Sequence, residues 1–160
     1  MRLPLIPSLA ELVSEFGGNT HLMLEIKEEP YPQPARQKQL LQEALAGLSP
    51  AADYHFLALD SELFKRVDFA PPETCLPVCE LNVSRLSSDS ITRGYGGLTG
   101  HYLLLNNRLL HRHEEAGQAI GTGYTSSKYC LFRELNRGVE WIFSNHAVKI
   151  QRIRDRYLTD

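Results

Sequence analysis

Residues 21–27, His-Leu-Met-Leu-Glu-Ile-Lys, are the stretch that says most about the fold. An apolar run of this length is typical of a parallel strand that is covered on both faces. Glu25 and Lys27 interrupt the run at its end, two positions apart, so both side chains point to the same face. The alternation places Leu22, Leu24 and Ile26 on the face that helices cover, and the odd-numbered residues on the other.

Five more apolar runs of strand length follow, at Tyr54–Leu59, Leu76–Asn82, Thr99–Leu105, Ala119–Tyr124 and Val139–Phe143. Stretches with helical spacing separate them, and strands that alternate with helices predict a parallel sheet of about six βα units. Two architectures fit. One is an open doubly wound sheet, which 160 residues can complete, and the other is a (β/α)8 barrel with units missing, because a whole barrel usually needs about 250 residues.

Capping residues mark the beginnings of three expected helices. Ser8 and Glu11 have the spacing of a capping box. Asn107 is expected to cap a helix after the fourth strand, and Ser126 or Ser127 the helix after the fifth. The Thr125–Lys128 run could instead hold an anion at a helix N-terminus, because free N–H groups gather there.

The composition is that of an ordinary globular protein, and we expect residues 1–160 to form a single domain. The formal net charge of −2 argues against nucleic-acid binding, and there is no apolar run of about 18 residues that could span a membrane. The spacing of Cys75, Cys79 and Cys130 is not that of a zinc site, so we expect reduced, buried thiols and a cytoplasmic location.

Several groups of polar residues have ordinary structural explanations. His111, Arg112, His113 and Glu114 are typical of a solvated helix face, because helix positions two apart do not face each other. Trp141 is expected in the core. Basic residues recur at helical spacing near the C-terminus and predict the solvent-exposed side of a last helix. They are Lys149, Arg152, Arg154 and Arg156.

The end of the first strand is the main candidate site. Burying a carboxylate and an ammonium without partners is expensive, and ligands of parallel α/β folds collect at the carboxyl ends of strands. One interpretation is that Glu25 binds a divalent cation and Lys27 an anionic substrate. The other is a self-contained ion pair, and the spacing leaves both open. Glu80, if it points inward, could add a second carboxylate.

Five segments resemble the glycerophosphodiester phosphodiesterases in order and spacing over nearly the whole chain. They are IPSLAEL with LMLEIK (residues 6–12 and 22–27), ALDSELFKRV (58–67), GYTSS (123–127) and RGVEWIFSNHAVKIQ (137–151). The resemblance implies an incomplete (β/α)8 TIM-type barrel that begins shortly before the third strand of the family and lacks its first two strands.

That family hydrolyses glycerol phosphodiesters to glycerol 3-phosphate and an alcohol, with a divalent metal, in phospholipid metabolism. The resemblance implies that Glu25 is the metal-binding glutamate, Lys27 contacts the phosphate, and Tyr124 lines the substrate pocket. The HRG, ExD and HD motifs of the family are absent from this sequence, so no catalytic residue is assigned.

We therefore expect a truncated, inactive form in which calcium or magnesium binds weakly or not at all. A fragment of a longer enzyme, a natural truncation and strands supplied by another chain all remain open. Exposed sheet edges predict self-association. The alternative function is a non-enzymatic α/β module whose open sheet binds a small anionic ligand or a protein partner.

Overall fold

The structure is a computed structural model, and it describes residues 6–159. In chain order the elements of this part are α1 (Leu9–Phe16), β1 (Leu22–Glu25), α2 (Pro34–Leu45), β2 (Tyr54–Ala58), the 3-10 helices η1 (Ser61–Val67) and η2 (Pro72–Thr74), β3 (Cys75–Cys79), α3 (Val83–Arg93), β4 (Gly97–His101), α4 (Asn107–Glu115), β5 (Ala119–Gly123), α5 (Lys128–Asn136), β6 (Trp141–Phe143) and α6 (Ala147–Thr159).

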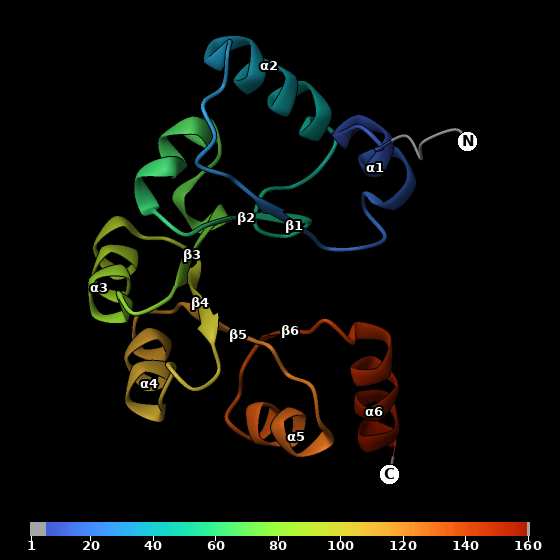
Figure 1. The fold of residues 1–160 in the computed structure, drawn as a ribbon, viewed down its shortest axis with the longest axis vertical. Coiled ribbons are helices and arrows are strands. Elements are labelled where there is room, and N and C mark those ends of the chain that lie inside the picture. The colour runs from blue at the N-terminus through green and yellow to red at the C-terminus, as the bar shows by residue number, and fades with distance from the viewer. Residues whose placement is uncertain (1–5, 160) are drawn as a thin grey trace.

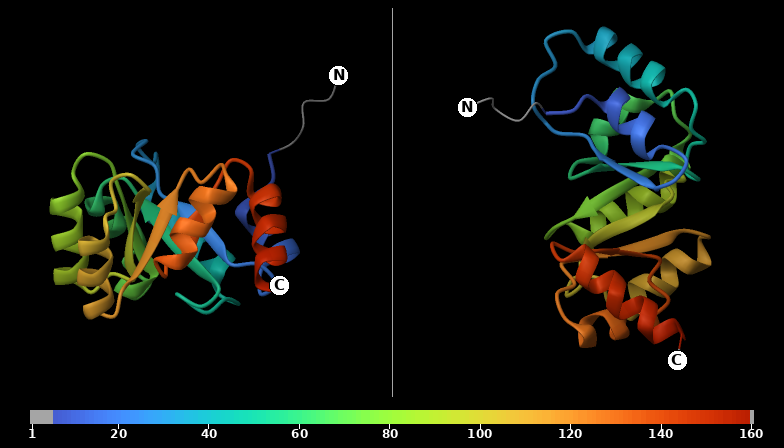
Figure 2. Two further views of the ribbon diagram at one scale, coloured as in Figure 1. Left: turned by 90° about the horizontal axis from the view of Figure 1, so that it is seen from below. Right: turned by 90° about the vertical axis from the view of Figure 1, so that its right-hand side faces the viewer.

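Within residues 6–159 the strands make one six-stranded sheet in the order β1-β2-β3-β4-β5-β6, and all neighbours are parallel. The sheet curls into an incomplete barrel, and the helices lie on its convex side (Figures 1 and 2). A doubly wound sheet reverses its strand order at a switch point and has helices on both faces. The curved parallel sheet is therefore confirmed, and the doubly wound alternative is wrong.

The convex face carries the hydrophobic core. Leu22, Leu24 and Ile26 of the first βα unit pack there, in a cluster that includes Tyr54 and Phe56 of β2. A second cluster, which includes Leu86 and Leu98, lies between the middle strands and helices α3 and α4. The alternation predicted for residues 21–27 is thus correct, and it leaves the odd-numbered residues of β1 on the concave face.

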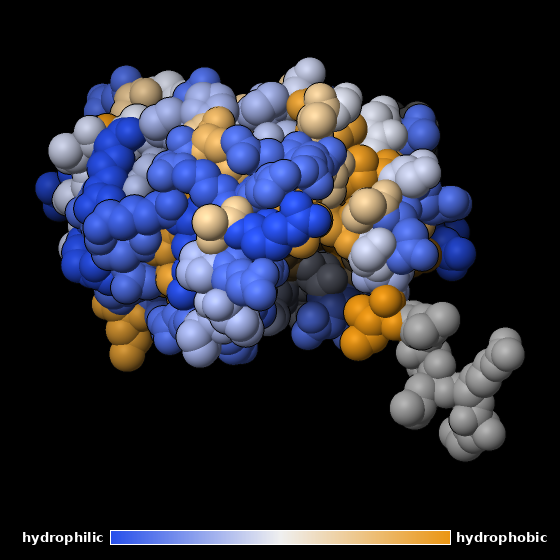
Figure 3. Space-filling model, turned by 90° about the horizontal axis from the view of Figure 1, so that it is seen from above, coloured by the Kyte–Doolittle hydropathy of each residue, from blue (hydrophilic) through white to orange (hydrophobic). Residues whose placement is uncertain are grey.

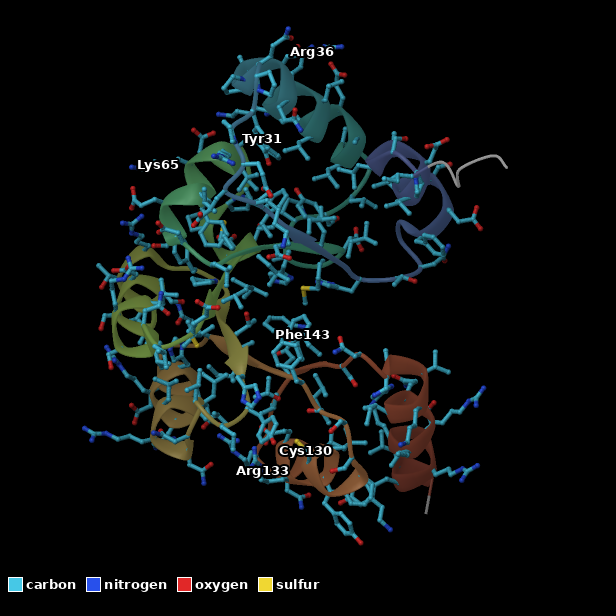
Figure 4. The ribbon with its side chains drawn as sticks, in the orientation of Figure 1. Tyr31, Arg36, Lys65, Cys130, Arg133 and Phe143 are labelled. Carbon is cyan, nitrogen blue, oxygen red and sulfur yellow. The ribbon has the colours of Figure 1, made fainter. Side chains whose placement is uncertain are left out.

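Glycines let the strands approach closely on the concave face. A Cβ on Gly121 of β5 would lie 2.8 Å from Cε2 of Phe143 and 2.9 Å from Cγ2 of Thr99. Phe143 can therefore point into the hollow of the sheet, as Figure 4 shows.

Two expected strands need correction at their ends. The fourth is Gly97–His101 and not Thr99–Leu105, and the third ends at Cys79 and not at Asn82. The helix after β4 is capped by Asn106 and not by Asn107, since the Asn106 side chain accepts a hydrogen bond from the Leu109 amide at 3.0 Å. The third strand ends early because the polar, turn-forming segment 80–82 follows it. The segment after β4, residues 102–105, is apolar but forms a turn, so hydrophobicity alone extends that strand too far.

Trp141 is only half-buried, which corrects the expectation of a core residue. Its ring meets the edge of the His55 ring at a centroid distance of 5.0 Å, inside the curve of the sheet. Cys75 and Cys79 are buried, Cys130 is half-buried, and all three are free thiols. Among the described residues, no helix is both long enough and apolar enough to cross a membrane.

Candidate functional site

A cavity of about 730 Å³ lies at the carboxyl ends of the strands. Its floor is apolar and includes Leu57 of β2 and Val78 of β3. Its polar lining comes from residues at or just after the ends of five strands, which are Glu25, Lys27, Glu80, His101, Tyr124, Ser144 and Asn145. The volume falls in the range of small-molecule sites, and converging polar groups above an apolar floor are typical of them.

Glu25 and Lys27 lie on the same side of the chain, as the sequence predicts, and they form an ion pair. The distance from Lys27 Nζ to Glu25 Oε1 is 2.7 Å, and the side chains are 59% and 41% exposed. The hydrogen bond to Glu25 raises the pKa of Lys27, so the ammonium stays charged well above neutral pH. A pair this open to water is weakly held, so an incoming anion can compete for Lys27.

His101, at the end of β4, belongs to this cavity although the sequence analysis does not assign it. Its Nδ1 accepts a hydrogen bond from the Leu103 amide at 3.2 Å. The neutral ring therefore carries its proton on Nε2, which no other described residue engages in a hydrogen bond. The ring stacks on Tyr102 at 4.5 Å, and this contact fixes its plane.

Tyr124 follows β5 and lies at this cavity. Its φ of 36° is in the left-handed region, which is unusual for a residue with a side chain. The Thr125 amide donates to the Phe143 carbonyl at 3.2 Å, which anchors the chain just after the strained position. The Tyr124 ring is 63% exposed and lies 5.6 Å from the His101 ring, so it forms a wall that a ligand could contact.

The carboxylates at the cavity do not make a metal centre. Glu25 is engaged by Lys27, and Glu80 is exposed on the rim. Nowhere in the described part of the chain do three or more His, Cys, Asp or Glu side chains converge as a metal site. Calcium takes six to eight oxygen ligands and magnesium needs near-octahedral geometry, so these residues do not fit a tightly bound divalent ion.

Two other polar features lie away from the polar lining of the cavity. Ser127 caps α5, with its hydroxyl accepting from the Cys130 amide at 3.2 Å, so the Thr125–Lys128 run has the capping geometry. His111 is exposed on α4, where it meets only Glu114 and Glu115 among the described residues, at 3.3 and 3.6 Å. His111 therefore has the solvated position that the spacing predicts. The prediction is wrong for His113, which is fully buried, with Nε2 2.9 Å from the Ser87 hydroxyl and Nδ1 2.8 Å from Oε1 of Gln118.

Comparison with known proteins identifies the fold. No family model matches the sequence, and no curated protein matches it. A solved glycerophosphodiester phosphodiesterase from Parabacteroides distasonis superposes with a TM-score of 0.70 and 15% identity, over 93% of this chain. An Oleispira antarctica phosphodiesterase in complex with the product sn-glycerol-3-phosphate superposes with a TM-score of 0.74 and 19% identity, over 94% of this chain.

These likenesses show that the chain has part of the glycerophosphodiester phosphodiesterase fold. The chain spans 63% of the length of the Parabacteroides protein and 62% of the Oleispira protein. The expectation of an incomplete barrel of this type is confirmed. The number of missing units stays a prediction.

Proposed function

We propose that this chain binds the glycerol-phosphate part of a glycerol phosphodiester, or glycerol 3-phosphate itself, in the cavity at the carboxyl ends of the strands. Lys27 is the phosphate contact, His101 donates a hydrogen bond from Nε2 to a phosphate oxygen, and Tyr124 flanks the organic part. The observation that carries the proposal is the convergence of these three side chains and Glu25 on one cavity of suitable volume.

The chemistry of each group supports its role. Lys27 is a charged ammonium whose present partner is an exposed carboxylate, so phosphate can share or replace Glu25. The orientation of His101 is fixed before a ligand arrives, because the Leu103 amide and the Tyr102 ring hold it. Preorganised donors lower the entropy lost on binding. A structural relative holds sn-glycerol-3-phosphate, which has this mixture of phosphate and hydroxyl groups.

We further propose that the chain, assayed by itself, does not turn over glycerophosphodiesters. Hydrolysis of a phosphodiester needs a group that activates the nucleophile and one that protonates the leaving alcohol. Among the described residues His101 is the only histidine that lines the cavity, and it has no second acid-base histidine beside it. Losing a general acid or base usually lowers the rate by a factor of about 10² to 10⁴.

Calorimetric titration with sn-glycerol 3-phosphate tests the binding proposal. The parent should bind it, and Lys27→Met should weaken binding at least about tenfold, as expected for the loss of a charged hydrogen bond. Lys65→Met is the matched control, because Lys65 pairs with Glu62 on η1, outside the cavity lining. Equal affinities for the parent and the Lys27 variant would refute the proposed phosphate site.

Three further measurements test the separate parts of the proposal. Calcium and magnesium titrations of the parent and Glu25→Gln should both show weak binding, and tight binding that survives the substitution would rule out a metal role for Glu25. Release of glycerol 3-phosphate from glycerophosphocholine should stay at background. Turnover that chelator abolishes would show an active enzyme. Binding of inorganic phosphate as tight as that of glycerol 3-phosphate would favour the non-enzymatic anion-binding alternative.

A further inference from the structure

The barrel is open on one side, and a helix stands at each edge of the opening. In residues 6–159, β1 pairs only with β2, and β6 only with β5. Helix α1 lies beside the β1 edge and α6 beside the β6 edge, and both face the gap in Figure 1. The opening is therefore bounded by two strand edges and two helices.

The strand edges are able to pair with further strands. The amides of Leu22 and Ile26 donate to the carbonyls of Asp53 and Leu57 in the β2 segment, at 2.9 and 2.8 Å. Successive amides of a strand point to opposite sides, so the amides of the intervening odd-numbered residues point to the open edge. Such an edge is a template for another chain.

Helix α1 presents an acidic and apolar surface. None of its residues is buried. Leu12 and Phe16 are 36% and 46% exposed, and they lie one turn apart. Glu11 and Glu15 are both exposed and adjoin these apolar residues on the helical wheel. Figure 3 shows hydrophobic surface at the α1 end of the face seen from above, whereas the surface over α2 is largely hydrophilic.

Helix α6 presents the opposite charge. Lys149 and Arg152 are exposed, lie one turn apart, and form no salt bridge with any described residue. They line a shallow groove of about 690 Å³ together with Ile153, and the neighbouring Val148 is 68% exposed. The apolar strip of α6, which these cations flank, therefore complements the apolar strip of α1, which carboxylates flank.

We propose that the chain forms a symmetric homodimer in which α1 of one copy packs against α6 of the other, twice. The charges favour a second copy of this chain as the partner, because one chain carries both complementary surfaces. In a symmetric dimer each acidic surface meets a basic one, so none is left over. The two-fold axis runs parallel to the barrel axis and brings β1 of each copy towards β6 of its partner. An axis across the barrel would bring α1 against α1 and α6 against α6, where like charges repel.

Charge reversal at the two surfaces tests this arrangement. Sedimentation velocity of the full chain should show dimers that weaken as salt rises. Glu15→Arg and Arg152→Glu should each raise the dimer dissociation constant at least about tenfold, because each homodimer then contains two like-charge contacts. An equimolar mixture of the two variants should dimerise again, since the mixed pair contains one native contact and one reversed contact. Lys65→Glu, on η1, is the control.

Three results would overturn the proposal: a monomer at every concentration, a dimer that neither reversal weakens, or a mixture of variants that stays monomeric. All the substituted side chains are exposed, so circular dichroism melting curves should match the parent. If either variant fails to fold, Glu15→Gln, which only removes the charge, and Lys149→Glu, one turn from Arg152, test the same two surfaces. A different protein seated on α1 would appear as a monomer in this assay.

Discussion

Acid should destabilise this protein through one buried histidine, His55 of β2. The side chain is 4% exposed. Its Nδ1 lies 2.8 Å from Nε2 of His21, whose Nδ1 donates to the Ala52 carbonyl at 2.9 Å. The Ala52 carbonyl can only accept, so the tautomers that fit these contacts have His55 Nδ1 donating to Nε2 of His21. The Trp141 ring lies against the other side of His55, so the imidazole has little access to water.

Burial, and to a smaller extent the nearby His21 ring, lower the pKa of His55 from 6.5 to about 4. The unfolded chain therefore takes up one more proton than the folded protein as the pH falls from 6.5 to 4. The stability that neutral His55 provides is fully present above pH 6.5 and is lost toward pH 4. A difference of 2.5 units corresponds to about 3 kcal/mol, a slope of about 1.4 kcal/mol per pH unit.

Urea unfolding of the parent and of His55→Phe, repeated between pH 7.5 and 4, measures this slope. Phenylalanine keeps a ring beside Trp141 but cannot titrate, so the variant should lose much less stability over the range. Burial also lowers the pKa of His113. His113 therefore contributes the same loss of stability in acid to both proteins, and its contribution cancels in the comparison. His111→Gln, on the surface of α4, is the control. Equal slopes for the parent and His55→Phe would refute the assignment.

Three further predictions concern burial, capping and thiol reactivity. Glu134 is a fully buried carboxylate that forms salt bridges with Arg133 and Arg137. Glu134→Ala should lower the free energy of unfolding, measured in urea, by about 3–5 kcal/mol, because it leaves buried charge unpaired, and Glu134→Gln should lower it less. Asn106→Ala removes the cap of α4 and should cost about 1 kcal/mol, and a change near zero would contradict the capping role. Burial raises the pKa of Cys75 to about 12 and that of Cys79 to about 11, so iodoacetamide should label Cys130 first in the native protein; equal labelling of all three would count against this.

The strand pattern was predictable because each strand of a parallel sheet is apolar on the face that helices cover. The exception at β4 has a local cause. The strand begins at Gly97, where a Cβ would lie 1.9 Å from the Ala119 carbonyl oxygen, so the strand needs glycine there. Because glycine supplies no apolar side chain, the beginning of the strand was invisible to hydrophobic periodicity.

Helix α3 shows a second limit of hydrophobic pattern. The segment is rich in serine, and its buried residues are Leu86, Ser87 and Ser90. Ser87 shares a 2.9 Å hydrogen bond with His113 of α4, and Ser90 donates to the Gly97 carbonyl at 2.6 Å. Buried hydroxyls are acceptable when hydrogen-bonded, and their partners are distant in sequence. Hydrophobic periodicity therefore does not reveal the buried side of α3, although that side lies in the core.

The site was predicted in part, and for a physical reason. The two-residue alternation of side chains in a strand is enough to place Glu25 and Lys27 on the same face at the end of β1. His101 was missed because the end of the fourth strand was placed four residues late, at Leu105, and because the histidines were searched for by motif. With β4 at Gly97–His101, the same alternation puts Thr99 and His101 on the concave face. Correct strand ends would thus have found the residue without any motif.

The two interpretations of Glu25 and Lys27 describe one arrangement in two conditions. Without a ligand, the 2.7 Å pair keeps Lys27 charged and held at the end of β1. When a phosphate enters, it must share Lys27 with Glu25 or displace that carboxylate, and the like charge of Glu25 works against the ligand. Binding should therefore be weak in the parent and tighter in Glu25→Gln. Measured affinity for glycerol 3-phosphate that falls in Glu25→Gln would show instead that the carboxylate holds Lys27 in position for the phosphate.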